Sequence, residues 1–183
     1  MRELRYSVAA SLDGYIAGPN GEFDWILMDP EIDFAAMYAS FGGIVMGRRS
    51  YEVFVGTGGA VGPPLPTYVY SRTLPEGERD GVTFARDAVA HVRALKAGDG
   101  KRLWLWGGGE LFRQLAEADL VDGVDVAIIP VLLGGGLPLL PTPGPRLKLH
   151  LRNHRLYATT GTLTLDYDVV RDDAAGRQAE RHT

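Results

Sequence analysis

The stretch Leu103-Trp-Leu-Trp-Gly-Gly-Gly-Glu-Leu-Phe112 decides the fold prediction, because an apolar run meets three glycines just before a helical pattern. Residues 102–106 are predicted to form a buried strand, and residues 110–118 a helix with Leu111 and Leu115 one turn apart. Glycine lets the backbone approach a ligand closely, and the first N–H groups of a helix lack partners within the helix. The stretch therefore indicates a diphosphate-binding turn, with a plain tight turn as the alternative.

A second strand-to-helix junction lies upstream, in the stretch Ile44-Val-Met-Gly-Arg-Arg-Ser-Tyr-Glu52. Residues 43–46 are predicted to form a buried strand and residues 49–54 a short helix. Two arginines at a helix N-terminus are unfavourable on their own, because cations prefer the opposite end of the helix dipole. An anion bound between the arginines and the helix would explain them, and a solvated arginine pair is the alternative. The chain has no Gly-x-Gly-x-x-Gly motif and no P-loop, so a Rossmann dinucleotide site is not expected.

A polar, glycine-rich segment over residues 11–21 directly follows the first predicted strand, residues 6–10. Its Asp-Gly and Asn-Gly pairs are turn signals. A segment of this kind at the carboxyl end of a sheet suits a mobile flap over a pocket. A plain connecting loop is the alternative.

The remaining patterns alternate between helix and strand. The clearest helix spans residues 87–97, where Asp87 is a predicted N-cap, and another is predicted from Pro30 to Phe41. Further strands are predicted at residues 67–71, 125–129, 147–152 and 162–169, of which the last two have a two-residue period. This order predicts an α/β fold whose sheet is mostly parallel with an antiparallel end.

The domain prediction follows from the loops. The Gly- and Pro-rich stretches at residues 56–66 and 134–145 are too short for domain linkers and are predicted to be surface loops. Residues 1–171 are therefore expected to form one domain, and residues 172–183 a polar, frayed tail.

Composition excludes several classes of function. The chain has 183 residues and a net charge of −4, and no basic run exceeds the pair Arg48-Arg49, so a nucleic-acid partner is not expected. It has no cysteine, which excludes disulfides, thiolate nucleophiles and iron–sulfur clusters, and its four histidines form no metal-binding pattern. The N-terminal segment has no apolar core and no apolar run reaches the length of a membrane span, so we expect a cytoplasmic protein without a membrane partner.

The 11–21 segment and the two strand-to-helix junctions occur in an order that resembles that of the dihydrofolate reductase-like superfamily. The chain is most similar to the riboflavin-biosynthesis reductase domain, the C-terminal domain of the bifunctional deaminase/reductase, and to its stand-alone relatives. The matching pieces are Ser11-Leu-Asp-Gly-Tyr-Ile-Ala-Gly18, Val45-Met-Gly-Arg-Arg-Ser-Tyr-Glu52, Trp106-Gly-Gly-Gly-Glu-Leu111 and Ile129-Pro-Val-Leu-Leu-Gly-Gly-Gly-Leu-Pro-Leu139. The resemblance implies a three-layer fold with a central mixed, mostly parallel sheet of about eight strands, a C-terminal antiparallel hairpin and flanking helices.

The resemblance also implies NADPH as cofactor, and arginines near a phosphate monoester favour NADPH over NADH. Carried over by position, the residues fall into four groups. The phosphates would be held by Gly47, Arg48, Arg49 and Ser50, the adenosine 2′-phosphate bordered by Ser71 and Arg72, the diphosphate bound by Gly108, Gly109, Glu110 and Leu111, and the nicotinamide lined by Ala9 and Ile16.

The implied activity is that of an NADPH-dependent reductase, which transfers a hydride to a small heterocyclic or imine substrate such as 5-amino-6-(5-phosphoribosylamino)uracil. Asp13 is the candidate catalytic residue, and Trp25 and Asp33 are candidate substrate-binding residues. No second basic cluster is visible in the sequence for a ribose 5′-phosphate. An inactive NADPH-binding or regulatory module is the alternative, and a dihydrofolate reductase a minor one.

The resemblance further implies a homodimer that pairs through a sheet edge. The apolar segments around Trp104 and Ile128 are the candidate contact regions. Trp104 and Trp106 share one face of their predicted strand, so they are expected in the core or in a subunit interface.

Overall fold

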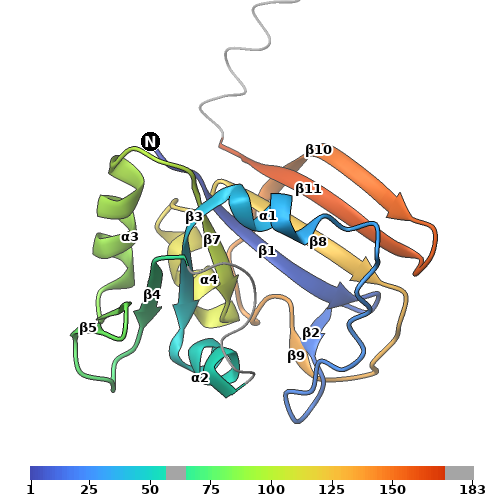
Figure 1. Cartoon of the computed structure of the whole chain (residues 1–183), viewed down its shortest axis with the longest axis horizontal. Coiled ribbons are helices and arrows are strands. Elements are labelled where there is room, and N and C mark those ends of the chain that lie inside the picture. The colour runs from blue at the N-terminus through green and yellow to red at the C-terminus, as the bar shows by residue number, and fades with distance from the viewer. Residues whose placement is uncertain (57–64, 172–183) are drawn as a thin grey trace, which may run out of the picture.

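A nine-stranded mixed sheet forms the centre of the computed structural model, which describes residues 1–56 and 65–171 (Figure 1). Its strand order is β10-β11-β8-β1-β7-β3-β4-β6-β5. The strands are β1 (Leu4–Ser11), β3 (Phe41–Gly47), β4 (Thr67–Tyr70), β5 (Gly77–Arg79), β6 (Val82–Ala85), β7 (Arg102–Gly107), β8 (Gly123–Ile129), β10 (Lys148–Tyr157) and β11 (Thr162–Val170). The six strands from β8 to β6 are parallel, and β5, β10 and β11 add antiparallel pairs at the two ends. The predicted mostly parallel sheet with a C-terminal hairpin is confirmed.

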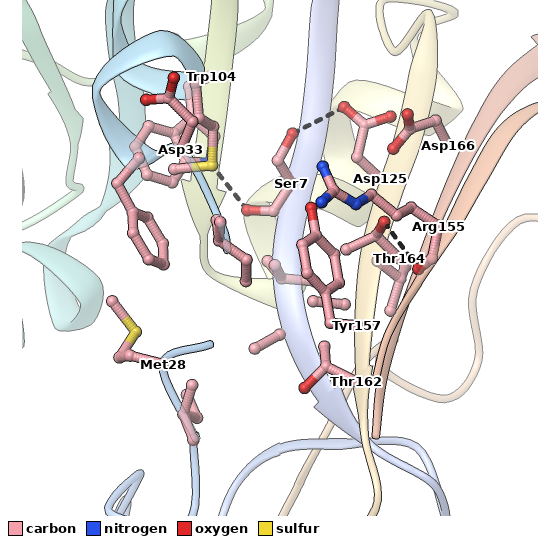
Figure 2. A pocket seen from close by; sticks show the side chains of 18 of the residues that line it. Ser7, Met28, Asp33, Trp104, Asp125, Arg155, Tyr157, Thr162, Thr164 and Asp166 are labelled. Carbon is pink, nitrogen blue, oxygen red and sulfur yellow. Dashed lines mark hydrogen bonds between the residues drawn. The ribbon is translucent and has the colours of Figure 1, made fainter. Parts of the chain in front are cut away.

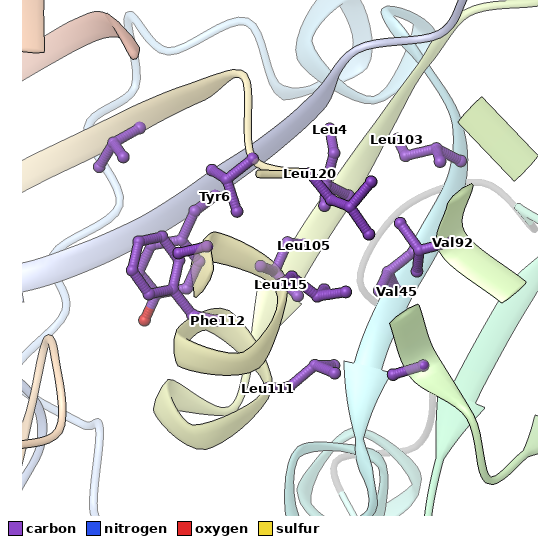
Figure 3. Packing of buried hydrophobic residues seen from close by; sticks show 14 of the residues in the cluster. Leu4, Tyr6, Val45, Val92, Leu103, Leu105, Leu111, Phe112, Leu115 and Leu120 are labelled. Atoms are coloured by element: carbon purple, nitrogen blue, oxygen red, sulfur yellow. The ribbon is translucent and has the colours of Figure 1, made fainter. Parts of the chain in front are cut away.

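Helices cover both faces of this sheet. They are α1 (Phe34–Ala39), α2 (Arg48–Gly56), α3 (Ala88–Ala97) and α4 (Gly109–Glu117). Helices α3 and α4 pack against one face, and α1 and α2 against the other, each pair with its own apolar cluster. Figure 3 shows the cluster at α4, where Leu111, Phe112 and Leu115 point at the sheet and the ring of Phe112 lies 4.6 Å from that of Tyr6. The three-layer prediction is therefore confirmed.

The structure differs from the sequence-based prediction at the first helix. That helix begins at Phe34 rather than at Pro30, because the carboxylate of Asp33 accepts the Ala36 N–H at 2.8 Å and caps it. It ends at Ala39, and Phe41 begins β3 instead of ending the helix.

Four short strands had no predicted counterpart. Strands β2 (Tyr15–Ala17) and β9 (Leu137–Pro138) form a separate antiparallel pair, and β5 and β6 extend the main sheet. All of β5 is exposed, so it carries none of the apolar alternation on which strand prediction depends.

The predicted position of the dimer contact is wrong. Trp104 lies in β7 and Ile128 in β8, and both strands are internal. The ring of Trp104 is buried against Tyr38 and Phe41, at centroid distances of 5.6 and 5.3 Å. The edge strand nearest to β8 is β10, two strands away, and its Leu149, Leu151 and Leu156 are exposed. A homodimer itself stays a prediction.

Two predictions concern residues outside the described part of the chain. They are the greater part of the first surface loop, residues 57–64, and the tail, residues 172–183. Among residues 1–56 and 65–171, no helix is long and apolar enough to cross a membrane.

Candidate functional site

The two glycine-rich junctions lie side by side at the carboxyl ends of two neighbouring strands. Strands β3 and β7 are parallel neighbours, and Met46 is paired with Gly107 near their carboxyl ends. A Cβ atom added to Gly108 would lie 3.6 Å from the backbone nitrogen of Gly47 and 3.7 Å from its Cα. Helices α2 and α4 therefore start next to each other (Figure 1).

The backbone of the α4 junction requires glycine. Gly108 has a φ of 98°, in the region that L side chains rarely adopt, and no side chain hydrogen bond caps the helix there. A Cβ on Gly107 would lie 3.0 Å from Ser50 Oγ. The first-turn amides of α4 lack partners within the helix, and the neighbouring atoms at Gly107 and Gly108 are backbone and small side chains, an arrangement that suits an anion.

Three arginines belong to the segments next to these junctions. Arg48 and Arg49 begin α2, and Arg72 follows β4, the next strand in the sheet. Arg48 Nη1 donates to Glu52 Oε1 at 2.7 Å, whereas Arg49 and Arg72 are exposed. Helix amides and guanidinium groups are the donors that a dinucleotide with an additional phosphate monoester needs, so the residues present fit NADPH.

Three of the residues expected at the cofactor have side chains that are engaged within the protein, so only their backbone is available to a ligand. The Glu110 carboxylate accepts hydrogen bonds from Arg113 and Gln114, which lower its pKa to about 2, and Arg72 adds a weaker effect. The Leu111 side chain is buried in the core. Ser71 is also buried, and its Oγ accepts the backbone N–H groups of Thr73 and Leu74, so it shapes the turn.

A cavity of about 570 Å³ lies on the α1 face of the sheet. Its walls are apolar side chains of α1, of residues 26–28 and of β7, including Trp104 and Trp106. Figure 2 shows Trp104 and Met28 in these walls. Of the two residues expected near the nicotinamide, Ala9 is part of the cavity lining, whereas Ile16 packs against the apolar cluster of α3 and α4.

The floor of the cavity consists of two adjacent rows that run across four strands. The strand register places one row at Ser7, Asp125, Asp166 and Asn153, and the next row at Ala9, Ala127, Thr164 and Arg155. The first row is polar, and the two alanines of the second row leave a flat patch beside it. Figure 2 shows Asp125 and Asp166 side by side in this floor.

A buried arginine lies in the row next to the polar row, on the same face of the sheet. Arg5 is fully buried and donates to both oxygens of Asp125, at 2.6 and 2.9 Å, and to Asp168 Oδ1 at 2.9 Å. Burial opposes its charge, but these hydrogen bonds outweigh the burial and raise the pKa of Arg5. Ser7 Oγ also donates to Asp125 at 2.9 Å, so the Asp125 carboxylate is fully engaged within the protein.

The structure places the candidate catalytic residue Asp13 outside the cavity lining. Its carboxylate accepts hydrogen bonds from Ser11 Oγ at 2.6 Å and from the N–H groups of Gly134 and Leu133 at 2.7 and 3.1 Å. These bonds lower the pKa of Asp13, and an ionised carboxylate is a poor proton donor. The geometry favours a role in which Asp13 ties the 11–21 segment to the loop after β8.

The two candidate substrate residues differ in position. Trp25 does not line the cavity, and its Nε1 donates to the Glu22 carbonyl at 3.2 Å. Asp33 does line it, beside Phe34.

Sequence reasoning missed Asp125 and Asp166, although the two-residue period of residues 162–169 placed Thr164 and Asp166 on one strand face. Among the described residues, no cluster of His, Asp and Glu side chains suits a metal ion.

A buried carboxylate holds the segment before α1 in place. Asp29 accepts hydrogen bonds from Glu31 N and from Thr160 N and Oγ1, at 2.9, 3.1 and 2.8 Å. Burial opposes its ionisation, but these bonds outweigh it and lower the pKa of Asp29. Ionised Asp29 therefore stabilises the fold above pH 3.8, the ordinary value, and this contribution is lost as the pH falls through the lowered pKa.

The variant Asp29→Asn is therefore expected to melt a few degrees below the wild type at neutral pH. The difference should shrink as the pH falls into the acid range, because wild-type Asp29 then becomes protonated. Thermal unfolding across pH measures it, with the exposed Asp24→Asn as the control from the same segment. A difference that grows on acidification contradicts this role of Asp29.

Comparisons with known proteins agree with one another on the family and the fold of the chain. The RibD C-terminal domain family matches residues 2–165. The uncharacterized protein YyaP of Bacillus subtilis (strain 168) is 30% identical over 177 residues, covering 86% of this chain and 90% of its own. Two solved structures are similar in fold. A protein described as a riboflavin biosynthesis protein, from Shewanella sp. PV-4, has a TM-score of 0.74 at 25% identity and covers 93% of this chain and 100% of its own. The dihydrofolate reductase from Enterococcus faecalis complexed with NADP(H) has a TM-score of 0.66 at 19% identity and covers 92% and 97%.

Proposed function

The chain belongs to the RibD C-terminal domain family, and we propose on this basis that it is an NADPH-dependent reductase of a small nitrogen heterocycle or imine. One observation carries the proposal: the junctions at Gly47 and Gly108 meet at the carboxyl ends of β3 and β7. The same sheet bears a cavity on its α1 face. The similarity in fold to a dihydrofolate reductase complexed with NADP(H) supports the same cofactor.

In this proposal the chain binds and orients the cofactor. The first-turn amides of α4 hold the diphosphate, and Arg48, Arg49 and Arg72 bind the 2′-phosphate and its neighbours. Bound NADPH supplies the hydride. Ala9, in the cavity lining, has a side chain small enough to leave room for the nicotinamide ring against the sheet.

The 11–21 segment follows Ala9 directly and is fastened to a neighbouring loop. Strand β2, within this segment, pairs with β9, and Leu12 N donates to Val131 O at 2.9 Å. Together with Asp13, these bonds fasten the segment to residues 129–138. A segment fixed next to Ala9 would limit the access of solvent to a nicotinamide bound there.

The double variant Arg48→Ala/Arg49→Ala tests the cofactor assignment. We expect its affinity for NADPH to fall about 10- to 100-fold, because it loses charge-assisted hydrogen bonds to the 2′-phosphate, while its affinity for NADH changes by less than about threefold. Calorimetric titration of both nucleotides measures the two affinities. Arg152→Ala, on β10 at the far edge of the sheet, is the matched control. Equal weakening of NADPH and NADH contradicts the phosphate assignment.

Loss of NADPH absorbance with a panel of aminopyrimidines, pterins and cyclic imines tests turnover. Saturable oxidation with at least one compound supports a reductase. Binding of NADPH without oxidation by any compound identifies the chain as a cofactor-binding module instead.

A further inference from the structure

A second cavity lies on the opposite face of the sheet from the cavity described above. Its volume is about 320 Å³, at the lower end of the ordinary range of small-molecule sites. Leu165 and Tyr167 of β11 line it, and they alternate along the strand with Thr164 and Asp166 of the α1 face. Phe112 of α4 lines it as well, so the second cavity belongs to the α4 face. The sheet therefore separates it from the candidate functional site.

The lining of the second cavity is apolar from its inner end to its mouth. Tyr6 and Phe112, whose rings lie 4.6 Å apart, are almost fully buried, so the cavity reaches into the core (Figure 3). Leu140 and Leu149 are exposed and leave it open to solvent. Among the residues that the structure describes, none that lines it is charged. An uncharged apolar molecule gains free energy by entering such a space, whereas an ion would lose its hydration without a partner.

One wall of the second cavity is a proline-rich loop. Residues 139–147 form this wall, and they include Pro141, Pro143 and Pro145. Because each proline ring fixes its own φ angle, the loop has few other conformations and loses little entropy when a ligand binds. The first residue of the loop is held to β1, since Tyr6 Oη donates to Leu139 O at 3.1 Å. The second cavity is therefore preformed.

Two tyrosines provide the polar side-chain groups of the lining. The hydroxyl of Tyr6 is already engaged by Leu139 O. Within residues 1–56 and 65–171, the hydroxyl of Tyr167 makes no hydrogen bond, although the backbone oxygen of this residue accepts one from Arg5. A hydroxyl can both donate and accept. The half-buried Tyr167 thus suits a ligand that carries a single polar group on an apolar body.

The second cavity is connected to the 11–21 segment through one residue. Leu139 lines the cavity, and its N–H donates to Gly14 O at 2.8 Å. The preceding residue, Pro138, is paired with Tyr15 in the sheet formed by β2 and β9. A ligand that packs against Leu139 therefore stabilises the loop to which the 11–21 segment is fastened.

We propose that the second cavity binds a small, uncharged aromatic molecule with one hydroxyl or carbonyl group, and that this molecule stabilises the 11–21 segment through Leu139. The proposal goes beyond the reductase activity, because it requires neither NADPH nor turnover. Aromatic rings favour the inner end, where Tyr6 and Phe112 offer ring contacts. A flat surface of a second copy of the chain would contact only the rim at Leu140 and Leu149 and would leave this inner end unfilled.

Calorimetric titration of 2-naphthol into the full chain tests the site. We expect saturable binding to the wild type and a loss of affinity of about 10-fold or more in Leu165→Trp, because the indole ring occupies the second cavity. Leu163→Trp is the matched control: it lies on the same face of β11 but outside the lining, and its affinity should stay within about threefold of the wild type. Thermal unfolding shows that both variants are folded.

A second variant tests the polar group without filling the cavity. Tyr167→Phe should weaken the binding of 2-naphthol by about 2- to 10-fold, because one hydrogen bond is lost, while the affinity for naphthalene should change by less than about twofold. The charged analogue 2-naphthalenesulfonate should bind the wild type more weakly than 2-naphthol does. Amide hydrogen exchange at Leu139 and Leu12, whose N–H groups are both hydrogen-bonded between the two segments, should slow when 2-naphthol is bound.

Four results overturn the proposal. They are no saturable binding of 2-naphthol to the wild type, equal affinity of Leu165→Trp and the wild type, tighter binding of the sulfonate, and unchanged amide exchange at Leu139 in the complex. Sedimentation of the same proteins separates the competing occupant. Self-association that Leu165→Trp abolishes, in a wild type that does not bind 2-naphthol, assigns the second cavity to a second copy instead. The titration of NADPH is independent of all these measurements, so the proposed function stands or fails separately.

Discussion

Gly108→Val is expected to lower the affinity for NADPH by about 100-fold or more, the largest effect on binding that the structure predicts. The φ of 98° at this position places a β-branched residue in a strained conformation. Its Cβ would lie 3.6 Å from Gly47 N, so the added methyl groups would enter the space between the two junctions. That space is where the diphosphate meets the first-turn amides of α4.

Calorimetric titration of NADPH into this variant measures the effect, and thermal unfolding separates it from a general loss of structure. Gly98→Val provides the control. Gly98 ends α3 with a φ of −73°, and a Cβ there meets only the Leu95 carbonyl oxygen, at 3.6 Å. If Gly108→Val binds NADPH with wild-type affinity, the result contradicts a diphosphate site at this junction.

The largest effect on stability is expected for Gly123→Ala. A Cβ on Gly123 would lie 2.3 Å from Arg5 Cζ, so the guanidinium would have to leave its position. Arg5 is fully buried, and a displacement breaks its bonds to Asp125 and Asp168. Breaking a buried ion pair in this way costs about 3–5 kcal/mol, which is a large share of the stability of a typical domain.

Denaturant unfolding of Gly123→Ala measures this loss of free energy. Gly135→Ala is the control, because a Cβ on Gly135 meets no atom within 4 Å. A loss below about 1 kcal/mol in Gly123→Ala would show that Arg5 finds other partners without strain, and would contradict its fixed position beside the polar row of the cavity floor.

The parts of the fold that the sequence predicted are those with long, local patterns. The apolar runs before Gly47 and Gly107 marked two buried strands, and the helical period after Gly109 marked α4. Strands β5 and β6 escaped because they are short and β5 is exposed, so they have no pattern to detect. The start of α1 was placed too early because Pro30 suits a first helical position, while the actual cap is Asp33, whose bond to Ala36 N depends on the local backbone.

The candidate site also has parts that the sequence predicted and parts that it did not. Each glycine junction was visible in the sequence, and their contact follows from the pairing of β3 with β7. The cavity floor was not visible, because Asp125 and Asp166 are distant in the chain and come together only through the register of β8 with β11. The buried Arg5 was also missed, since a charged residue inside a strand is ordinarily exposed unless a partner neutralises it.

A crystal structure of the protein soaked with NADPH tests the central claim most directly. We predict that the diphosphate hydrogen-bonds to the first-turn amides of α4, that the 2′-phosphate lies among Arg48, Arg49 and Arg72, and that the nicotinamide lies beside Ala9. A nucleotide bound elsewhere, or first-turn amides of α4 covered by the protein's own side chains in the presence of saturating NADPH, would contradict the account.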